Sequence, residues 1–422
     1  MFERPRGGER AILVNVELAP PARRGDTAEF YELVCSAGVS PVLTIAARRA
    51  RPDPKYFVGL GKAEELKAAV AETGAEVALF DRSLSPAQER NLERLLCCRV
   101  LDRTGVILDI FAQRARSFEG KLQVEMAQLT HLSTRLVRGW THLERQRGGI
   151  GLRGPGETQL ETDRRLIGKR IKQLAERLDK VRRQRAQGTR ARKRAALSTA
   201  ALVGYTNAGK STLFNQLTAS QAYAADQLFA TLDTTLRRMN VPGEHPVLVS
   251  DTVGFIRDLP PELIAAFQAT LDETKDATLL LHVLDASADD LDMRRAEVQA
   301  VLTRIGAGGT PVIEVYNKID LSADPTPRME PAGEDSPLRV WVSAQNGRGI
   351  ELLKNAVAEH LAQAKQRRRI ELPAHAGRLR AQLYENGAVL AEEPIAEGGW
   401  TLDLSVSDAR WSQLVAAAED AD

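Results

Sequence analysis

The sequence contains few cysteines and no long apolar run, and each scarcity excludes a class of protein. Only three of the 422 residues are cysteines, Cys35, Cys97 and Cys98, and no C-x-x-C spacing occurs. Neighbouring cysteines rarely pair with each other, so we expect neither a disulfide framework nor a cysteine metal site, as is usual in a reducing compartment. No stretch of about 18 apolar residues is present, so no membrane-spanning helix is expected. The charged N-terminus lacks the apolar segment of a signal peptide, and we expect a cytoplasmic protein.

Net charge is also almost absent, because 58 basic side chains face 56 acidic ones for a total of +2, but the charges are unevenly distributed. Residues 164–194 contain fourteen arginines and lysines against two acidic residues, Glu176 and Asp179, which is a net charge of +12. Residues 371–422 contain three arginines and ten acidic residues. This asymmetry predicts a polyanionic partner for the middle of the chain and argues against RNA contact by its C-terminal part.

The length and composition predict several globular domains. The hydrophobic fraction of 43% and the charged fraction of 27% are ordinary for folded proteins. A chain of 422 residues corresponds to about three domains of typical size. Short apolar stretches alternate with helical patterns near the start, and we expect a parallel α/β N-terminal domain over residues 1–105. Its strands are predicted over 11–18, 42–46, 76–81 and 99–102, and its helices over 26–37, 61–73 and 85–96.

Residues 106–195 have the pattern of an antiparallel helical hairpin. Apolar side chains recur at steps of three, four or seven in two segments, as in a coiled-coil seam. The first segment carries Leu122, Met126, Leu129, Leu136, Trp140 and Leu143, and the second carries Leu160, Ile167, Ile171, Leu174, Leu178 and Val181. The tip loop, residues 145–159, is rich in glycine and arginine, which suits either contact with phosphates or a merely flexible tip. The second helix carries the basic run, and residues 187–194 are interpreted as a linker to the next domain.

A phosphate-binding loop follows a predicted strand over 200–203. Its pattern is G-x-x-x-x-G-K-S, and a helical pattern comes directly after it. Backbone N–H groups of such a loop surround a phosphate, the lysine reaches the β- and γ-phosphates, and the serine hydroxyl binds Mg²⁺. The candidate nucleotide-binding residues are Gly204, Tyr205, Thr206, Asn207, Ala208, Gly209, Lys210 and Ser211.

Three further motifs follow in order, each after a predicted strand. They are Asp251, Thr252, Val253 and Gly254 after the strand over 247–250, Asn317, Lys318, Ile319 and Asp320 after the strand over 311–316, and Ser343, Ala344 and Gln345 after the strand over 339–342. The first motif can support the metal through its aspartate and bond a γ-phosphate through its glycine N–H. The Asp320 carboxylate can accept both N1–H and N2–H of guanine, a donor pair that adenine lacks. The backbone of the third motif can contact guanine O6, so GTP and GDP are the expected ligands.

Together the motifs resemble those of the HflX family of ribosome-associated P-loop GTPases, within the translation-factor-related class. The resemblance covers about residues 8–365. It rests on GYTNAGKSTLFN at 204–215, LFATLD at 228–233, DTVGFI at 251–256, NKID at 317–320 and, most specifically, GGIGLRGPGETQLE at 148–161. It implies a first switch made of Phe229, Ala230, Thr231, Leu232 and Asp233. Within it, Thr231 would ligate Mg²⁺ together with Ser211, although the residues alone leave Thr234 and Thr235 open.

The resemblance further implies a GTP-hydrolysing enzyme that uses Mg²⁺, with Lys210, Thr231 and Gly254 as its catalytic residues. It implies binding to the large ribosomal subunit, with rRNA contacts through residues of about 145–194, and splitting or rescue of stalled ribosomes under stress. The alternative is a GTP-dependent regulatory switch that acts on a protein partner. A monomer is expected in either case.

Phe255 directly follows Gly254, where many GTPases place a glutamine that orients the attacking water. A phenylalanine cannot form a hydrogen bond with that water, so hydrolysis is expected to be slow until a partner completes the site, and the resemblance implies that this partner is the ribosome. The other interpretation, compatible with the first, is that Phe255 packs in the core.

The expected fold class is therefore α/β. A P-loop GTPase domain over residues 196–366 follows the N-terminal domain and the hairpin. Residues 381–411 alternate between polar and apolar side chains before a helical pattern, which predicts a small α+β C-terminal domain over residues 367–422.

Overall fold

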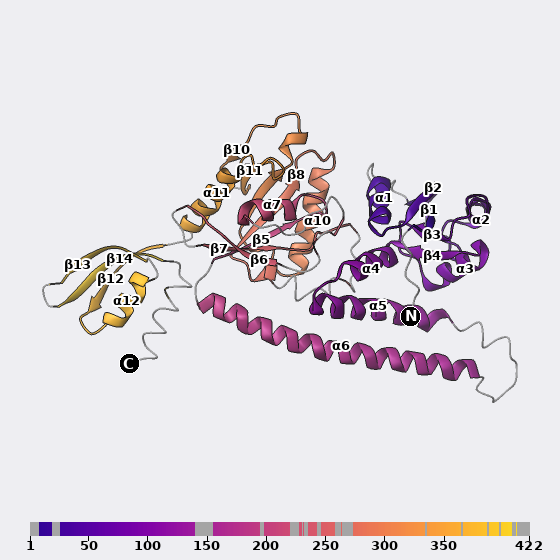
Figure 1. The fold of residues 1–422 in the computed structure, drawn as a ribbon, viewed down its shortest axis with the longest axis horizontal. Helices are drawn as coiled ribbons and strands as arrows, with labels where there is room; N and C mark the ends of the chain where they lie inside the picture. Colours follow the sequence, from indigo (N-terminus) through magenta and orange to yellow (C-terminus); the bar gives the residue numbers. More distant parts are fainter. Residues whose placement is uncertain are drawn as a thin grey trace.

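Figure 1 shows the computed structural model, in which the sheets follow one another along the chain while two long helices run beneath the first two domains. The structure describes residues 8–18, 26–139, 155–194, 198–219, 228–229, 231, 235–242, 246–257, 263, 273–333, 336–363, 366–385, 388–395, 398–406 and 411. Within these residues the strands form three sheets. The α/β fold class is confirmed, as are the parallel N-terminal sheet, the helical hairpin and the small C-terminal α+β unit.

The N-terminal domain is built on a parallel sheet with the strand order β2-β1-β3-β4. Successive side chains of its central strand point to opposite faces of the sheet. Ala11 and Leu13 pack in one cluster with residues of α1 and α4, while Ile12 and Val14 pack in another with residues of α2 and α3. Both faces are buried, which explains the continuous apolar run in this strand. The elements are β1 (Arg10–Leu18), α1 (Asp26–Ser36), β2 (Ser40–Arg49), α2 (Leu60–Thr73), β3 (Val77–Phe80), α3 (Pro86–Leu96), β4 (Arg99–Asp102) and α4 (Arg103–Arg114).

The hairpin consists of α5 (Phe118–Gly139) and α6 (Pro155–Arg194). The predicted seam is confirmed where it is described, because Leu122 of α5 packs against Leu174 and Leu178 of α6. An ion pair between Arg170 and Glu125, with 2.7 Å between Nη2 and Oε1, joins the same two helices. Trp140, Leu143 and residues 145–154 of the predicted hairpin lie outside the described residues.

The interpretation of residues 187–194 as a linker is wrong, because α6 continues to Arg194. The helix propensities of alanine, arginine, lysine and glutamine outweigh the single unfavourable Gly188. The last five residues of the expected tip loop, 155–159, are also helical. Pro155 stands at the first helical position, where the missing N–H costs nothing.

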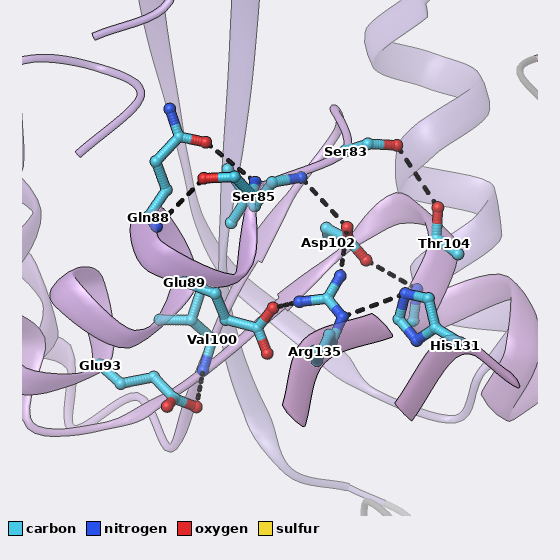
Figure 2. A network of polar contacts seen from close by, with 12 residues as sticks. Ser83, Ser85, Gln88, Glu89, Glu93, Val100, Asp102, Thr104, His131 and Arg135 are labelled. Carbon is cyan, nitrogen blue, oxygen red and sulfur yellow. Dashed lines mark hydrogen bonds and ion pairs between the residues drawn. The ribbon is translucent and has the colours of Figure 1, made fainter. Parts of the chain in front are cut away.

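A partly buried ion cluster connects α5 with the N-terminal domain (Figure 2). We call Glu89, Asp102, His131 and Arg135 the Arg135 cluster. The Arg135 guanidinium of α5 contacts the Asp102 carboxylate at 2.8 Å and also pairs with Glu89 of α3. Its Nε donates a hydrogen bond of 3.1 Å to Nε2 of His131 one turn earlier. Asp102 also caps α4 by accepting a 2.9 Å bond from the N–H of Gly105. One side chain therefore ties the end of a strand and three helices together.

The central domain carries a sheet with the order β10-β11-β9-β8-β5-β7-β6 in the described residues. Its inner strands run parallel, and β6 and β10 pair antiparallel at the two edges. The strands predicted before each motif are all present, with ends that differ by one residue. The elements are β5 (Thr199–Gly204), α7 (Lys210–Thr218), β6 (Thr235–Met239), β7 (Val247–Asp251), β8 (Leu279–Asp285), α10 (Leu291–Arg304), β9 (Val312–Asn317), the 3-10 helix η2 (Ile319–Leu321), β10 (Arg328–Glu330), β11 (Leu338–Trp341) and α11 (Ile350–Gln363).

The N-terminal and central domains share one continuous hydrophobic cluster. Phe30 of α1 and Phe111 of α4 belong to the same cluster as Tyr205 and Phe255 of the central domain. Polar contacts border it, because the Tyr205 hydroxyl donates to the Glu29 carboxylate of α1. The central domain is therefore docked on α1 and α4 through a cluster that includes residues of β5 and α10, together with Tyr205 and Phe255.

The C-terminal domain is a three-stranded antiparallel sheet with the order β12-β14-β13, packed on one helix. Its small core includes Leu383, Leu402 and Leu404. The elements are β12 (Gln366–Pro373), α12 (Gly377–Glu385), β13 (Val389–Pro394) and β14 (Gly399–Val406). Among the helices that the structure describes, none is long and apolar enough to cross a bilayer. The three cysteines are free thiols.

Candidate nucleotide-binding site

A cavity of about 520 Å³ opens at the carboxyl edge of the central sheet, a size typical of small-ligand sites. It is lined by fourteen residues that the sequence motifs predicted: Thr206, Asn207, Gly209, Lys210, Ser211, Phe229, Thr231, Thr252, Gly254, Asn317, Lys318, Asp320, Ala344 and Gln345. Thr212 and Leu321 also line it and were not singled out from the sequence. Seven predicted residues are absent from the lining, namely Gly204, Tyr205, Ala208, Asp251, Val253, Ile319 and Ser343. Ala230, Leu232 and Asp233 lie outside the described residues.

The P-loop glycines are required by the backbone that forms this cavity. Gly204 ends β5 with a φ of +152°, and a Cβ there would lie 2.3 Å from the Val283 carbonyl oxygen. Gly209 precedes α7 with a φ of +89°, and a Cβ there would lie 2.2 Å from Nδ2 of Asn317. The N-terminus of α7 consequently faces the cavity without side chains in the way, which is the geometry that binds phosphate.

Lys210 lies at the first position of α7 with 6% of its surface exposed. Its ammonium donates to the carbonyl oxygens of Tyr205 at 2.6 Å and Gly204 at 3.2 Å. Burial lowers the pKa of this ammonium to about 8, against the opposing attraction of Asp251. A phosphate anion in the cavity would favour the charged form of Lys210.

The side-chain oxygens of Ser211, Thr231 and Asp251 meet at one end of the cavity. The Ser211 and Thr231 hydroxyl oxygens lie 2.6 Å apart, and they donate to Oδ2 of Asp251 at 2.7 and 2.9 Å. Burial raises the pKa of Asp251, although these hydroxyls and the Lys210 charge oppose the rise. Its other oxygen, Oδ1, is buried without a hydrogen-bond partner among the described residues. Two hydroxyls beside a carboxylate with spare acceptor capacity fit the hard oxygen donors that Mg²⁺ prefers.

Gly254 lets the loop after β7 approach the P-loop closely. A Cβ at Gly254 would lie 2.9 Å from Cγ2 of Thr206 and 3.0 Å from Nζ of Lys210. The next residue is bonded to the P-loop on both sides, because its carbonyl accepts from Thr206 N at 2.7 Å and its N–H donates to Gly204 O at 3.1 Å. The Phe255 side chain itself is 3% exposed and belongs to the cluster shared with α1 and α4. The interpretation that Phe255 packs in the core is therefore confirmed.

Asn317 joins the two ends of the cavity. Its Nδ2 donates to the Ala208 carbonyl of the P-loop at 2.9 Å, and its Oδ1 accepts from Ala344 N at 2.9 Å. Asp320 accepts a hydrogen bond from the Ser343 hydroxyl, which orients its carboxylate. The predicted guanine-reading loops are thus bonded to each other.

Asp285 holds a cavity-lining residue in place and was missed by the sequence motifs. It ends β8, and its Oδ2 lies 2.9 Å from Nζ of Lys318. Lys318 has a φ of +65°, so the loop after β9 turns sharply at this residue. The available signal was the position of Asp285 at the carboxyl end of a buried strand.

Comparisons with known proteins match most of the chain. Residues 25–112 match the family model described as GTP-binding GTPase N-terminal, residues 114–192 the GTP-binding GTPase Middle Region, and residues 199–318 the model described as 50S ribosome-binding GTPase. The GTPase HflX of Escherichia coli strain K12 is 54% identical over 414 residues, which covers 98% of this chain and 97% of that protein. The GTPase HflX of Magnetococcus marinus is 44% identical over 396 residues, covering 92% and 91%. The crystal structure of SsGBP in complex with GDP aligns with a TM-score of 0.48 at 23% identity and covers 84% of this chain and 99% of that one.

Proposed function

Because the chain belongs to the HflX family of GTPases and thus binds GTP and hydrolyses it, we propose that its GTPase cycle controls binding to the large ribosomal subunit. The outcome of binding would be the splitting or rescue of stalled ribosomes under stress. The observation that carries this proposal is α6, a helix of 40 residues that presents an exposed basic surface and leads directly into the GTPase domain.

The roles of the site residues follow from their positions. Lys210 and the N–H groups at the start of α7 would hold the β- and γ-phosphates, and Gly254 would approach the γ-phosphate by its backbone. Ser211 and Thr231, supported by Asp251, would hold Mg²⁺, which supplies neutralisation of the phosphate charge when bound. Asp320 would accept the two guanine N–H groups.

The basic surface of α6 suits RNA phosphates. Lys172, Arg177 and Lys180 are exposed and take no part in the cluster that joins α6 to α5. Phosphate contacts release counterions from RNA, so binding should weaken steeply as salt concentration rises. The tip loop between α5 and α6 would add shape-specific contacts with folded rRNA.

Cosedimentation with purified large ribosomal subunits tests the proposal. The full chain is mixed with subunits in the presence of GDP or a non-hydrolysable GTP analogue, at several salt concentrations. We expect binding that is stronger with the analogue and that falls with added salt. Subunit binding that depends on neither the nucleotide nor the salt concentration would favour the alternative of a switch acting on a protein partner.

A charge-matched pair of variants separates the α6 surface from general electrostatics. Replacing Lys172, Arg177 and Lys180 with glutamine should weaken subunit binding at least tenfold and flatten its salt dependence. Replacing the exposed Lys275, Arg304 and Arg378 with glutamine removes the same charge elsewhere and should leave binding within about twofold. Equal losses in both triple variants would contradict a role for α6 itself.

A further inference from the structure

The first switch is held by the N-terminal domain rather than by the GTPase domain alone. Leu228 and Phe229 lie three and two residues before the cavity-lining Thr231. The Leu228 N–H donates to Oγ of Ser36, the last residue of α1, at 3.3 Å. The Leu228 carbonyl accepts from Arg114, the last residue of α4. Both backbone groups of Leu228 are thus bonded to another domain.

An aromatic contact holds the next residue. The rings of Phe229 and Phe111 of α4 are tilted by 53° with centroids 4.7 Å apart, a favourable arrangement for aromatic pairs. Both side chains are buried, and Phe229 also lines the nucleotide cavity. Its φ of +57° is uncommon for a residue with a side chain, so the surroundings must hold this conformation in place.

We call the contacts of Leu228 and Phe229 with α1 and α4 the anchor. Thr231 lies two residues beyond Phe229. Two residues of chain span at most about 7 Å, so the anchor limits where the Thr231 hydroxyl can reach. In the anchored arrangement, that hydroxyl lies beside Ser211 and Asp251, as described above. This is the place where a switch threonine must be to respond to a γ-phosphate and its metal.

We propose that Ser36, Phe111 and Arg114 are positioning residues of the N-terminal domain, which place Thr231 for GTP and so set the preference of the site for GTP over GDP. The inference rests on the proposed role of Thr231. It follows that the N-terminal domain contributes to nucleotide selection without touching the nucleotide. GDP lacks the γ-phosphate, so its binding depends little on the anchor.

The test is fluorescence titration of the full chain with labelled GDP and with a labelled non-hydrolysable GTP analogue. Arg114→Met removes the bonds to the Leu228 and Ser36 carbonyl oxygens, and Ser36→Ala removes the acceptor for Leu228 N–H. Each should weaken the GTP analogue about fivefold to tenfold while changing GDP affinity less than twofold. The matched control is Gln113→Ala, a substitution on the same helix as Arg114. It removes a 3.0 Å hydrogen bond to the Ala37 carbonyl oxygen and should change the affinity for neither GDP nor the GTP analogue.

A double-mutant cycle with Thr231→Ala completes the experiment. If the anchor acts through Thr231, adding Arg114→Met to Thr231→Ala should cause no further loss of GTP analogue binding. Equal weakening of both nucleotides, or additive losses in the double variant, would overturn the proposal. Failure of wild-type protein to bind large ribosomal subunits would instead refute the proposed function and leave this cycle unaffected.

Discussion

Asp320 is the residue on which guanine selection depends. Asp320→Asn replaces one carboxylate acceptor with a donor that opposes the guanine N–H groups. GTP affinity should fall by about 2 kcal/mol or more, roughly thirtyfold, while xanthosine triphosphate, which carries a carbonyl at that position, should bind better. Titration of both nucleotides measures the change. The control is Asp324→Asn, an exposed carboxylate outside the cavity, and unchanged GTP affinity in Asp320→Asn would disprove the assignment.

His282 should make stability depend on pH. It lies in the middle of β8 with 2% of its surface exposed, and burial lowers its pKa to about 4, assisted by the charges of Arg295 and Lys210. The unfolded chain binds a proton near pH 6.5, so the stability that neutral His282 contributes is complete above that pH. It is lost as the pH falls toward 4 and amounts to about 3 kcal/mol.

The measurement is urea unfolding of the wild type and of His282→Leu between pH 7 and pH 4.5. The wild type should lose stability relative to the variant as the solution becomes more acidic. Parallel pH profiles would show that His282 is not neutral in the folded state.

The sequence predicted the site residues that occur in contiguous motifs and missed those that act from elsewhere. Lys210 and Asp320 stand in loops whose spacing reflects direct contact with a ligand. Asp285 contacts Lys318 and Arg114 contacts Leu228, and both come from elements outside these motifs. No local sequence pattern predicts these contacts, because the two residues of each pair lie far apart in the chain.

Among the elements, α5 is attached to the N-terminal domain by the Arg135 cluster as well as by buried apolar side chains such as Val124 and Ala127. Arg135→Met would leave the buried Asp102 carboxylate without its cation and should cost about 3–5 kcal/mol of unfolding free energy. Arg170→Met breaks a more exposed pair with Glu125 on the same helix pair and should cost less than about 1 kcal/mol. Urea unfolding followed by circular dichroism compares them, and similar costs would show that burial does not control the Arg135 contribution.

The element boundaries show where local signals fail. Strands before the motifs were placed to within a residue, because each is a short apolar run with a clear end. The length of α6 was underestimated, since Gly188 and Thr189 resemble a break although their neighbours favour helix. The helix α4 was not singled out, because its apolar residues form an almost continuous run over 106–111, which does not distinguish a buried helix from a strand.

For the whole molecule, we expect GTP hydrolysis to be slow until the large ribosomal subunit is bound. The Phe255 side chain is committed to the core shared by two domains, so it cannot orient the attacking water. Turnover by the isolated protein should lie far below the typical enzyme rate of about 10 per second, and purified large subunits should raise it. Phosphate release assays with and without subunits decide this. Rapid turnover by the protein alone would argue against completion of the site by a partner.

Among its described contacts, α6 is held to α5 near the middle of its length. Leu174 and Leu178 lie near the middle of α6. At about 1.5 Å per residue, roughly 28 Å of helix precedes this contact and roughly 24 Å follows it. A tilt of about 5° would therefore move both ends by about 2 Å in opposite directions. Only four residues separate the end of α6 from β5, the strand that carries Gly204. Displacement of the far end of α6 would therefore move the end next to β5 in the opposite direction.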